Sequence, residues 1–124
     1  MNLGDTFFNR NDGVRHLWDV TTSATPQDTV VIFNFTSWVD DGCDPSCIVE
    51  AGEHPHIKHK SYVSYLRGRE VETTLLRNPQ FCDPQPSVTP DLLYRVQSGA
   101  IASVYTKTKY ANMVRDCMPS DPHA

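Results

Sequence analysis

The sequence predicts a mainly β domain, a strongly bent sheet or small barrel of five to six strands, with helical structure confined to its C-terminal third. Three observations lead to this fold class. Short segments rich in β-branched and aromatic residues recur over residues 4–76. Four prolines over residues 79–90 interrupt that pattern. Apolar residues then recur at helical spacing after residue 90.

The clearest strand covers residues 29–37, where apolar residues are continuous at first and alternate with polar ones later. This pattern is typical of a strand near the middle of a sheet. Two earlier strands, over residues 4–8 and 14–21, flank the turn-forming Asn11-Asp12-Gly13, which predicts a hairpin. The later strands are expected at residues 46–50, 60–66 and 70–76.

The prolines predict a loop over residues 78–90. A helix is predicted over residues 90–98, because Thr89 is a good N-cap, Pro90 suits the first helical position and Gly99 suits a helix end. A second helix is predicted from the helical spacing of Tyr110, Met113, Val114 and Cys117.

The length of 124 residues is that of one domain, which we place at residues 1–118, with a flexible C-terminal tail over 119–124. No apolar run approaches the ~20 residues of a membrane span, and no export signal opens the chain, so we expect a cytoplasmic protein with free thiols. The net charge of −4 argues against a general polyanion binder. Residues 54–69, however, contain bases and no acid, which permits a local basic face of Lys58, Lys60, Arg67 and Arg69.

Several short motifs, in this order along the chain, resemble the MazF/PemK-like toxin endoribonucleases. They are Gly4-Asp5, residues 15–21 opened by Arg15, and residues 30–37 ending in Thr36-Ser37. Residues 52–63 are similar to the stretch of a PemK-like subgroup that enters the strand after the long loop. The resemblance covers most of residues 3–103, although Arg15 is followed by His16 where the family usually has Arg-Pro.

The resemblance implies an SH3-like barrel that forms a homodimer, cleaves RNA without a metal or other cofactor, and is neutralised by an antitoxin protein. It also implies that Arg15 is the catalytic arginine and that Thr36, with Ser37 beside it, supplies the catalytic hydroxyl. A dimer is expected for a second reason, because four aromatic side chains exceed what a small barrel easily buries. These side chains are Phe7, Phe8, Trp18 and Trp38.

The residues themselves are compatible with the same chemistry. Metal-free RNA cleavage needs a base for the 2′-hydroxyl, an acid for the leaving oxygen and a cation for the charge on phosphate. Arg15 is suited to the role of the cation, because a guanidinium group donates two hydrogen bonds to a phosphate. His16 or His59 is suited to the role of the acid or the base. Thr36 and Ser37 can donate to a phosphate oxygen. The substrate is expected to be single-stranded, since the 2′-hydroxyl must be free to align with its phosphate.

Two alternatives remain open at this point. One is a non-catalytic SH3-like module that binds RNA or protein, because fold does not determine function and the Arg-Pro pair is absent. The other is a zinc-stabilised domain, because soft and imidazole ligands cluster over residues 43–59. These candidate ligands are Cys43, Cys47, His54, His56 and His59.

Overall fold

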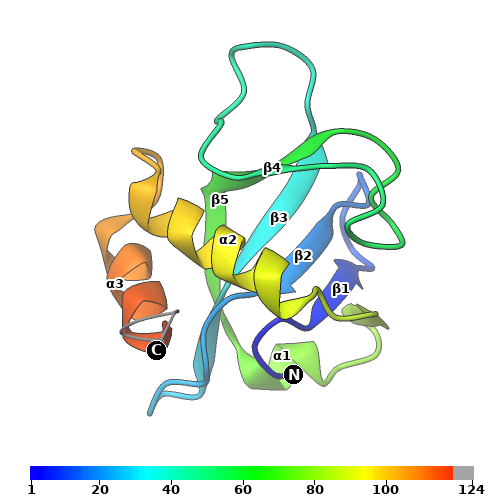
Figure 1. Cartoon of the computed structure of the whole chain (residues 1–124). Coiled ribbons are helices and arrows are strands. Elements are labelled where there is room, and N and C mark those ends of the chain that lie inside the picture. Colours follow the sequence, from blue (N-terminus) through cyan, green and yellow to red (C-terminus); the bar gives the residue numbers. More distant parts are fainter. Residues whose placement is uncertain (119–124) are drawn as a thin grey trace.

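A six-stranded antiparallel sheet, curled into a half-barrel, forms the body of the protein in the computed structural model, which describes residues 1–118 (Figure 1). The predicted tail over residues 119–124 lies outside the described residues. The strands follow the order β4-β5-β3-β2-β1-β6 across the sheet. Their bounds are β1 Thr6–Asn9, β2 Leu17–Val20, β3 Thr29–Ser37, β4 Ile48–Val49, β5 Ser61–Glu72 and β6 Cys82–Gln85. The mainly β fold predicted from the sequence is therefore confirmed.

Strand β3 lies in the middle of the sheet and has the predicted bounds. Its side chains are buried on both faces. Val31, Phe33 and Phe35 belong to a core cluster that also contains residues of helix α2 (Pro90–Ala102). Val30 and Ile32 belong to a second cluster on the opposite face. The continuous apolar run of this strand therefore reflects a sheet covered on both sides.

Helices α2 and α3 (Thr108–Cys117) cover one side of the sheet, with α2 crossing in front of it (Figure 1). Both helices were predicted from the sequence. The Thr89 hydroxyl accepts a hydrogen bond from the Leu92 backbone N–H at 3.1 Å, which confirms the predicted cap. No helix within residues 1–118 is long and apolar enough to span a membrane.

Helix α2 does not end at Gly99, as the sequence predicted, but continues to Ala102. Gly99 lies against β5 and the segment before β4. A methyl group there would overlap with the Tyr65 hydroxyl and the Ser46 carbonyl. The glycine therefore permits close packing and does not terminate the helix.

The segment predicted as two strands, over residues 60–66 and 70–76, is different in the structure. One long strand, β5, covers most of it, and its register against β3 shifts between Ile32 and Asn34. Gly68 packs directly on the Phe33 ring at this irregularity. The break in the sequence pattern is thus a bulge within one strand. Residues 73–76 form the short helix α1 (Thr73–Leu76), so helical structure is not confined to the C-terminal third.

The predicted loop over residues 78–90 is also wrong in part, because β6 lies within it. This strand pairs with β1 at the edge of the sheet and contains Pro84. An edge strand tolerates proline because only one of its sides needs N–H donors. The four prolines therefore conceal a strand that forms one end of the sheet.

The predicted hairpin is confirmed by the antiparallel pairing of β1 with β2. Strand β2 is shorter than the predicted 14–21, however, and residues 10–16 form a longer connection than a two-residue turn. Asp12 holds this connection together. Its carboxylate accepts hydrogen bonds from the Asn9 side-chain amide at 3.0 Å and from the Trp18 indole N–H at 3.0 Å.

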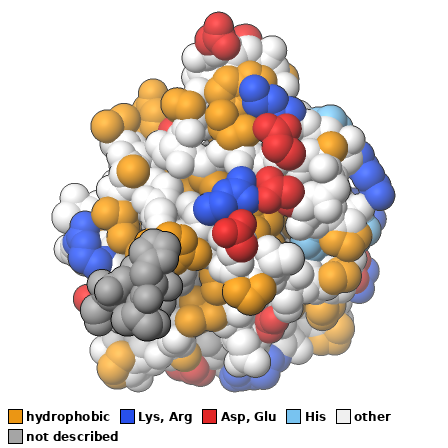
Figure 2. All heavy atoms as spheres, in the orientation of Figure 1, with side chains coloured by type: hydrophobic (Ala, Val, Ile, Leu, Met, Phe, Trp, Pro, Cys, Tyr) orange, Lys and Arg blue, Asp and Glu red, His pale blue; other side chains and the backbone are white. Residues whose placement is uncertain are grey.

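The loop between β4 and β5 is attached to α2 by Arg95. Its guanidinium donates to both carboxylate oxygens of Glu53 and to the Ile48 carbonyl, the last at 2.8 Å. Asp91 lies 3.6 Å away on the same helix. The Arg95 hydrogen bonds lower the pKa of the Glu53 carboxyl. Charges of both signs lie side by side over α2 on this face (Figure 2).

Asp19 is an unusual feature of β2, because its carboxyl is fully buried and neither oxygen has a hydrogen-bond partner among residues 1–118. Burial raises its pKa well above the ordinary value, and the negative charge of Asp5 adds to the shift. A folded-state pKa above the unfolded value means that the folded protein holds its proton more tightly. Stability therefore falls as the pH rises above about 4, the unfolded pKa of aspartate.

The Asp19→Asn substitution removes this titration while keeping the side-chain shape. We compare the unfolding free energy of the variant with that of the native chain at each pH. This difference should favour the variant by about 1–2 kcal/mol more at pH 8 than at pH 4. Urea unfolding at both pH values measures the difference. An equal fall in stability for both proteins between these pH values would contradict the assignment.

The Arg95→Ala substitution should release the loop over residues 50–59 without unfolding the sheet. Loss of its hydrogen bonds to partly exposed partners should cost about 1 kcal/mol. Amide hydrogen exchange should accelerate within that loop, while an Arg115→Ala variant on α3 serves as the control. Uniformly faster exchange over the whole sheet would show that Arg95 does not hold the loop in particular.

Candidate functional site

A pocket of about 190 Å³ lies at the end of the sheet where β2 begins and β3 ends. Apolar side chains of three adjacent strands form its floor, and the loop before β5 forms a wall. The polar residues that line it are Arg15, His16, Thr36, Ser37, His56, Lys58, His59 and Ser61. All five residues predicted as catalytic from the sequence are in this set.

The strand register explains why the early hairpin meets the end of β3. Leu17 of β2 lies opposite Phe35 of β3, and both contribute to the floor with Phe8 of β1. Before Leu17 the chain leaves the strand in a tight turn, in which the His16 backbone N–H donates to the Val14 carbonyl at 2.9 Å, and Arg15 lines the pocket together with Ser37. Arg15 and Ser37, 22 positions apart in the sequence, therefore border one cavity.

Arg15 projects over the floor of the pocket. Its guanidinium carbon lies 4.4 Å from the centre of the Phe8 ring, and one of its nitrogens lies 2.9 Å from the Asp83 carboxylate. The Arg15 side chain is 64% exposed. An incoming anion can therefore reach a guanidinium whose plane is already supported by an aromatic ring.

Ser37 and His59 form the closest polar pair of the pocket, with Ser37 Oγ 2.6 Å from His59 Nε2. Alternation along β3 directs Ser37 to the same face as Phe35, whereas Thr36 pairs with Tyr62 on the other face. The hydroxyl that contacts an imidazole is thus that of Ser37. Thr36, which the resemblance favours, is half-buried beside it.

The other basic side chains predicted for RNA are not all gathered here. Lys58 lines the pocket. Lys60 instead lies over the Trp38 ring, with its nitrogen 4.5 Å from the ring centre. Arg67 and Arg69 are exposed farther along β5, where Arg69 lies 6.0 Å from the Trp18 ring. The pocket itself therefore has two cations, Arg15 and Lys58, among its lining residues.

His54 holds the loop before β5, which forms the pocket wall, against the segment after β6. It is buried, and its Nδ1 accepts a hydrogen bond from the His56 backbone N–H at 3.1 Å. The proton is then on Nε2, which donates to the Pro86 carbonyl at 2.6 Å. Burial lowers the pKa of His54, so the ring is neutral at neutral pH. We assign it a structural role in joining the loop to the segment after β6.

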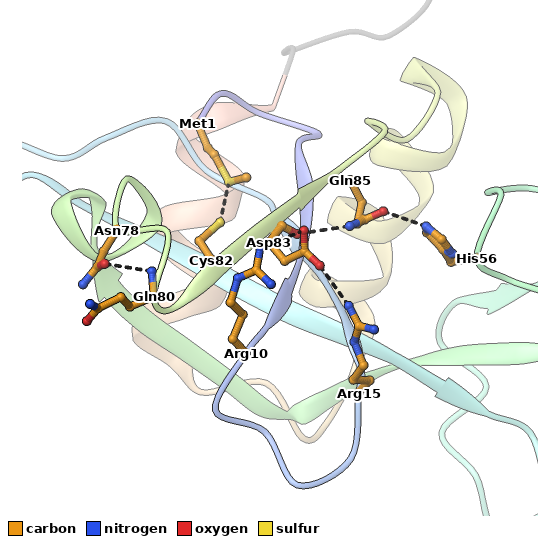
Figure 3. A network of polar contacts seen from close by, with 9 residues as sticks. All are labelled: Met1, Arg10, Arg15, His56, Asn78, Gln80, Cys82, Asp83 and Gln85. Atoms are coloured by element: carbon orange, nitrogen blue, oxygen red, sulfur yellow. Dashed lines mark hydrogen bonds and ion pairs between the residues drawn. The ribbon is translucent and has the colours of Figure 1, made fainter.

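Sequence reasoning missed Asp83 and Gln85, which lie next to the pocket, and it considered His56, which lines the pocket, only as a metal ligand. Figure 3 shows the two β6 side chains directed toward the hairpin and the loop. Asp83 contacts Arg15, and Gln85 Oε1 lies 2.7 Å from His56 Nε2. The pairing of Asp83 with Phe8 across the strands places it beside the pocket floor. The sequence predicted a loop for this segment, and the apolar Phe81-Cys82 pair is the one local feature in it that is typical of a strand.

The ligands of the zinc hypothesis are not assembled in the structure. Within residues 1–118, no group of three or more His, Cys, Asp or Glu side chains is arranged to hold a metal ion. The three histidines instead bond to separate groups: His54 to Pro86, His56 to Gln85 and His59 to Ser37. Burial raises the pKa of the Cys47 thiol to about 11, which disfavours the thiolate that zinc binds.

Comparison of the chain with known proteins gives no relative from which a role could be transferred. No family model matches the chain, and no curated protein matches it. The function must therefore be argued from the pocket and its chemistry.

Proposed function

We propose that the protein is a metal-independent endoribonuclease that cleaves single-stranded RNA, of the MazF/PemK-like toxin kind. The observation that supports this function is the pocket in which Arg15 and Lys58 border the Ser37–His59 pair. A cation, a hydroxyl and an imidazole in one small cavity are the groups that phosphodiester cleavage by a 2′-hydroxyl requires.

Each group has a role in the proposed reaction. In the free protein the Ser37 hydroxyl lies 2.6 Å from His59 Nε2. The ribose 2′-hydroxyl takes its place and gives its proton to Nε2, and the displaced Ser37 hydroxyl can donate to a phosphate oxygen. The 2′-oxygen then attacks phosphorus, and the bond from phosphorus to the 5′-oxygen breaks. Arg15 and Lys58 stabilise the charge on the phosphate oxygens. His16, the second histidine of the pocket expected to act in catalysis, gives a proton to the leaving oxygen.

The proposed fold is an SH3-like barrel. The curled antiparallel sheet and the helix after its last strand support it. Because the pocket lies at an end of the sheet and its basic residues are exposed, a flexible single strand can enter it more easily than a duplex can.

The proposed partners are a second copy of the chain and an antitoxin protein, as the resemblance implies. The four aromatic residues do not supply the apolar surface that a dimer needs, because Phe7 and Trp18 are buried and Phe8 and Trp38 are half-buried. Exposed apolar side chains occur elsewhere, and of these Leu66 and Tyr105 line one surface hollow. The exposed set is Val14, Val39, Leu66, Val104 and Tyr105.

Cleavage of a mixed-sequence RNA in EDTA tests the function. We expect the native chain to cut it, and His59→Ala to lower kcat about 10²- to 10⁴-fold, because a general base is lost. Arg15→Ala should lower kcat about 10²-fold or more, because the charge on phosphate loses its guanidinium partner. Arg115→Ala, an exposed arginine on α3, is the matched control and should cut at the native rate.

An oligonucleotide with deoxyribose at the cut position should resist cleavage, since the attacking hydroxyl is missing. Cutting of that substrate, or cutting that EDTA abolishes, would contradict the mechanism. Tight RNA binding without any cleavage would favour the non-catalytic module instead.

A further inference from the structure

Two arginines converge on the carboxylate of Asp83 beside the pocket. Arg15 lies 2.9 Å from Oδ2, and Arg10 lies 3.3 Å from Oδ1 (Figure 3). Both arginines come from the connection between β1 and β2, whereas Asp83 comes from the edge strand β6. The side chain of Arg10 is 48% exposed and that of Arg15 is 64% exposed, whereas that of Asp83 is 23% exposed.

The two positive guanidinium groups lie close together, and the negative carboxylate of Asp83 offsets their repulsion by contacting each of them with one oxygen. A phosphate group presents two similar oxygens and binds guanidinium in the same manner as a carboxylate. Arg15 is further supported by the Phe8 ring, and the Arg10 backbone N–H donates to the Phe81 carbonyl at 2.8 Å. The two guanidinium groups are thus preorganised around an anion position.

We propose that Arg10 and Arg15 form a phosphate site, which the carboxylate of Asp83 occupies in the free protein and which a phosphodiester group of the nucleic acid takes over on binding. This inference rests on the proposed function for the identity of the ligand. Asp83 is then an internal competitor that weakens binding to the arginine pair, and Arg10 is a binding residue that adds to those in the pocket.

The site selects a chain of nucleotides over a single one. Arg15 borders the pocket, whereas Arg10 does not line it. A chain whose reacting phosphate lies in the pocket therefore reaches Arg10 with a neighbouring phosphate, and Arg15 contacts both phosphates. Each phosphate bound by a cation also releases counterions, which makes affinity depend on salt. Salt dependence therefore counts the phosphate contacts directly.

The test is binding of a fluorescent single-stranded oligodeoxynucleotide, which lacks the 2′-hydroxyl and is not cut by the proposed reaction. The Asp83→Asn variant should bind roughly two- to fivefold tighter, the range that an exposed ion pair provides. Arg10→Gln should bind more weakly and reduce the slope of log affinity against log salt by about 0.7, one contact on a single strand. In a variant that combines Asp83→Asn with Arg10→Gln and Arg15→Gln, the gain should vanish.

Asp28→Asn is the matched control, because it removes the same charge from a second aspartate that pairs with an arginine, Arg77, at 3.9 Å. Weaker binding by Asp83→Asn, or a gain equal to that of Asp28→Asn, overturns the proposal, provided that circular dichroism shows both variants folded. A specific gain without RNA cleavage retains the phosphate site and rejects the nuclease. RNA cleavage without a specific gain does the reverse, and the absence of both oligonucleotide binding at low salt and RNA cleavage rejects both.

Discussion

The antiparallel pairing of β3 with β2 on one side and with β5 on the other is the constraint on which the rest of the structure depends. Because β3 is buried on both faces, a shift of its register by one residue would exchange the side chains of its two core clusters. The same register sets Leu17 opposite Phe35 on the pocket floor, which Arg15 and Ser37 border, and His59, just before β5, contacts the Ser37 hydroxyl. Core packing and site geometry are thus fixed by one set of strand pairs.

The site is positioned by contacts that lie behind it. Arg95 attaches the loop before β5 to α2, and the neutral His54 attaches it to the segment after β6. These contacts leave the solvent side of the pocket free for a ligand, and they limit the movement of the loop that contains His59. In the proposed reaction the base must be held within hydrogen-bond reach of its target proton, and this support would serve that purpose for His59.

Sequence patterns were sufficient where a local rule decides the structure. The apolar run of β3 and the Thr89 cap are of this kind. The convergence of Arg15 with Thr36-Ser37 is not local, and it was expected from the order of motifs in the resemblance. Local patterns failed where a distant partner decides. Gly99 is required by the Tyr65 hydroxyl, which lies 34 positions earlier in the chain, and no property of the helix itself reveals that contact. Strand β6 forms because the edge of β1 is available for pairing. The prolines around β6 hide this strand from a local reading of the sequence. Asp83 was missed for the same reason, and with it the contact that brings Arg10 beside Arg15.

The chemistry of the cut ends tests the central claim most directly, because it reports which oxygen attacks phosphorus. Attack by the 2′-hydroxyl, with His59 as base, predicts a 2′,3′-cyclic phosphate on one fragment and a 5′-hydroxyl on the other, both detectable by mass spectrometry. Fragments with a 3′-hydroxyl and a 5′-phosphate would show that water attacks instead, and would contradict the roles assigned to the pocket.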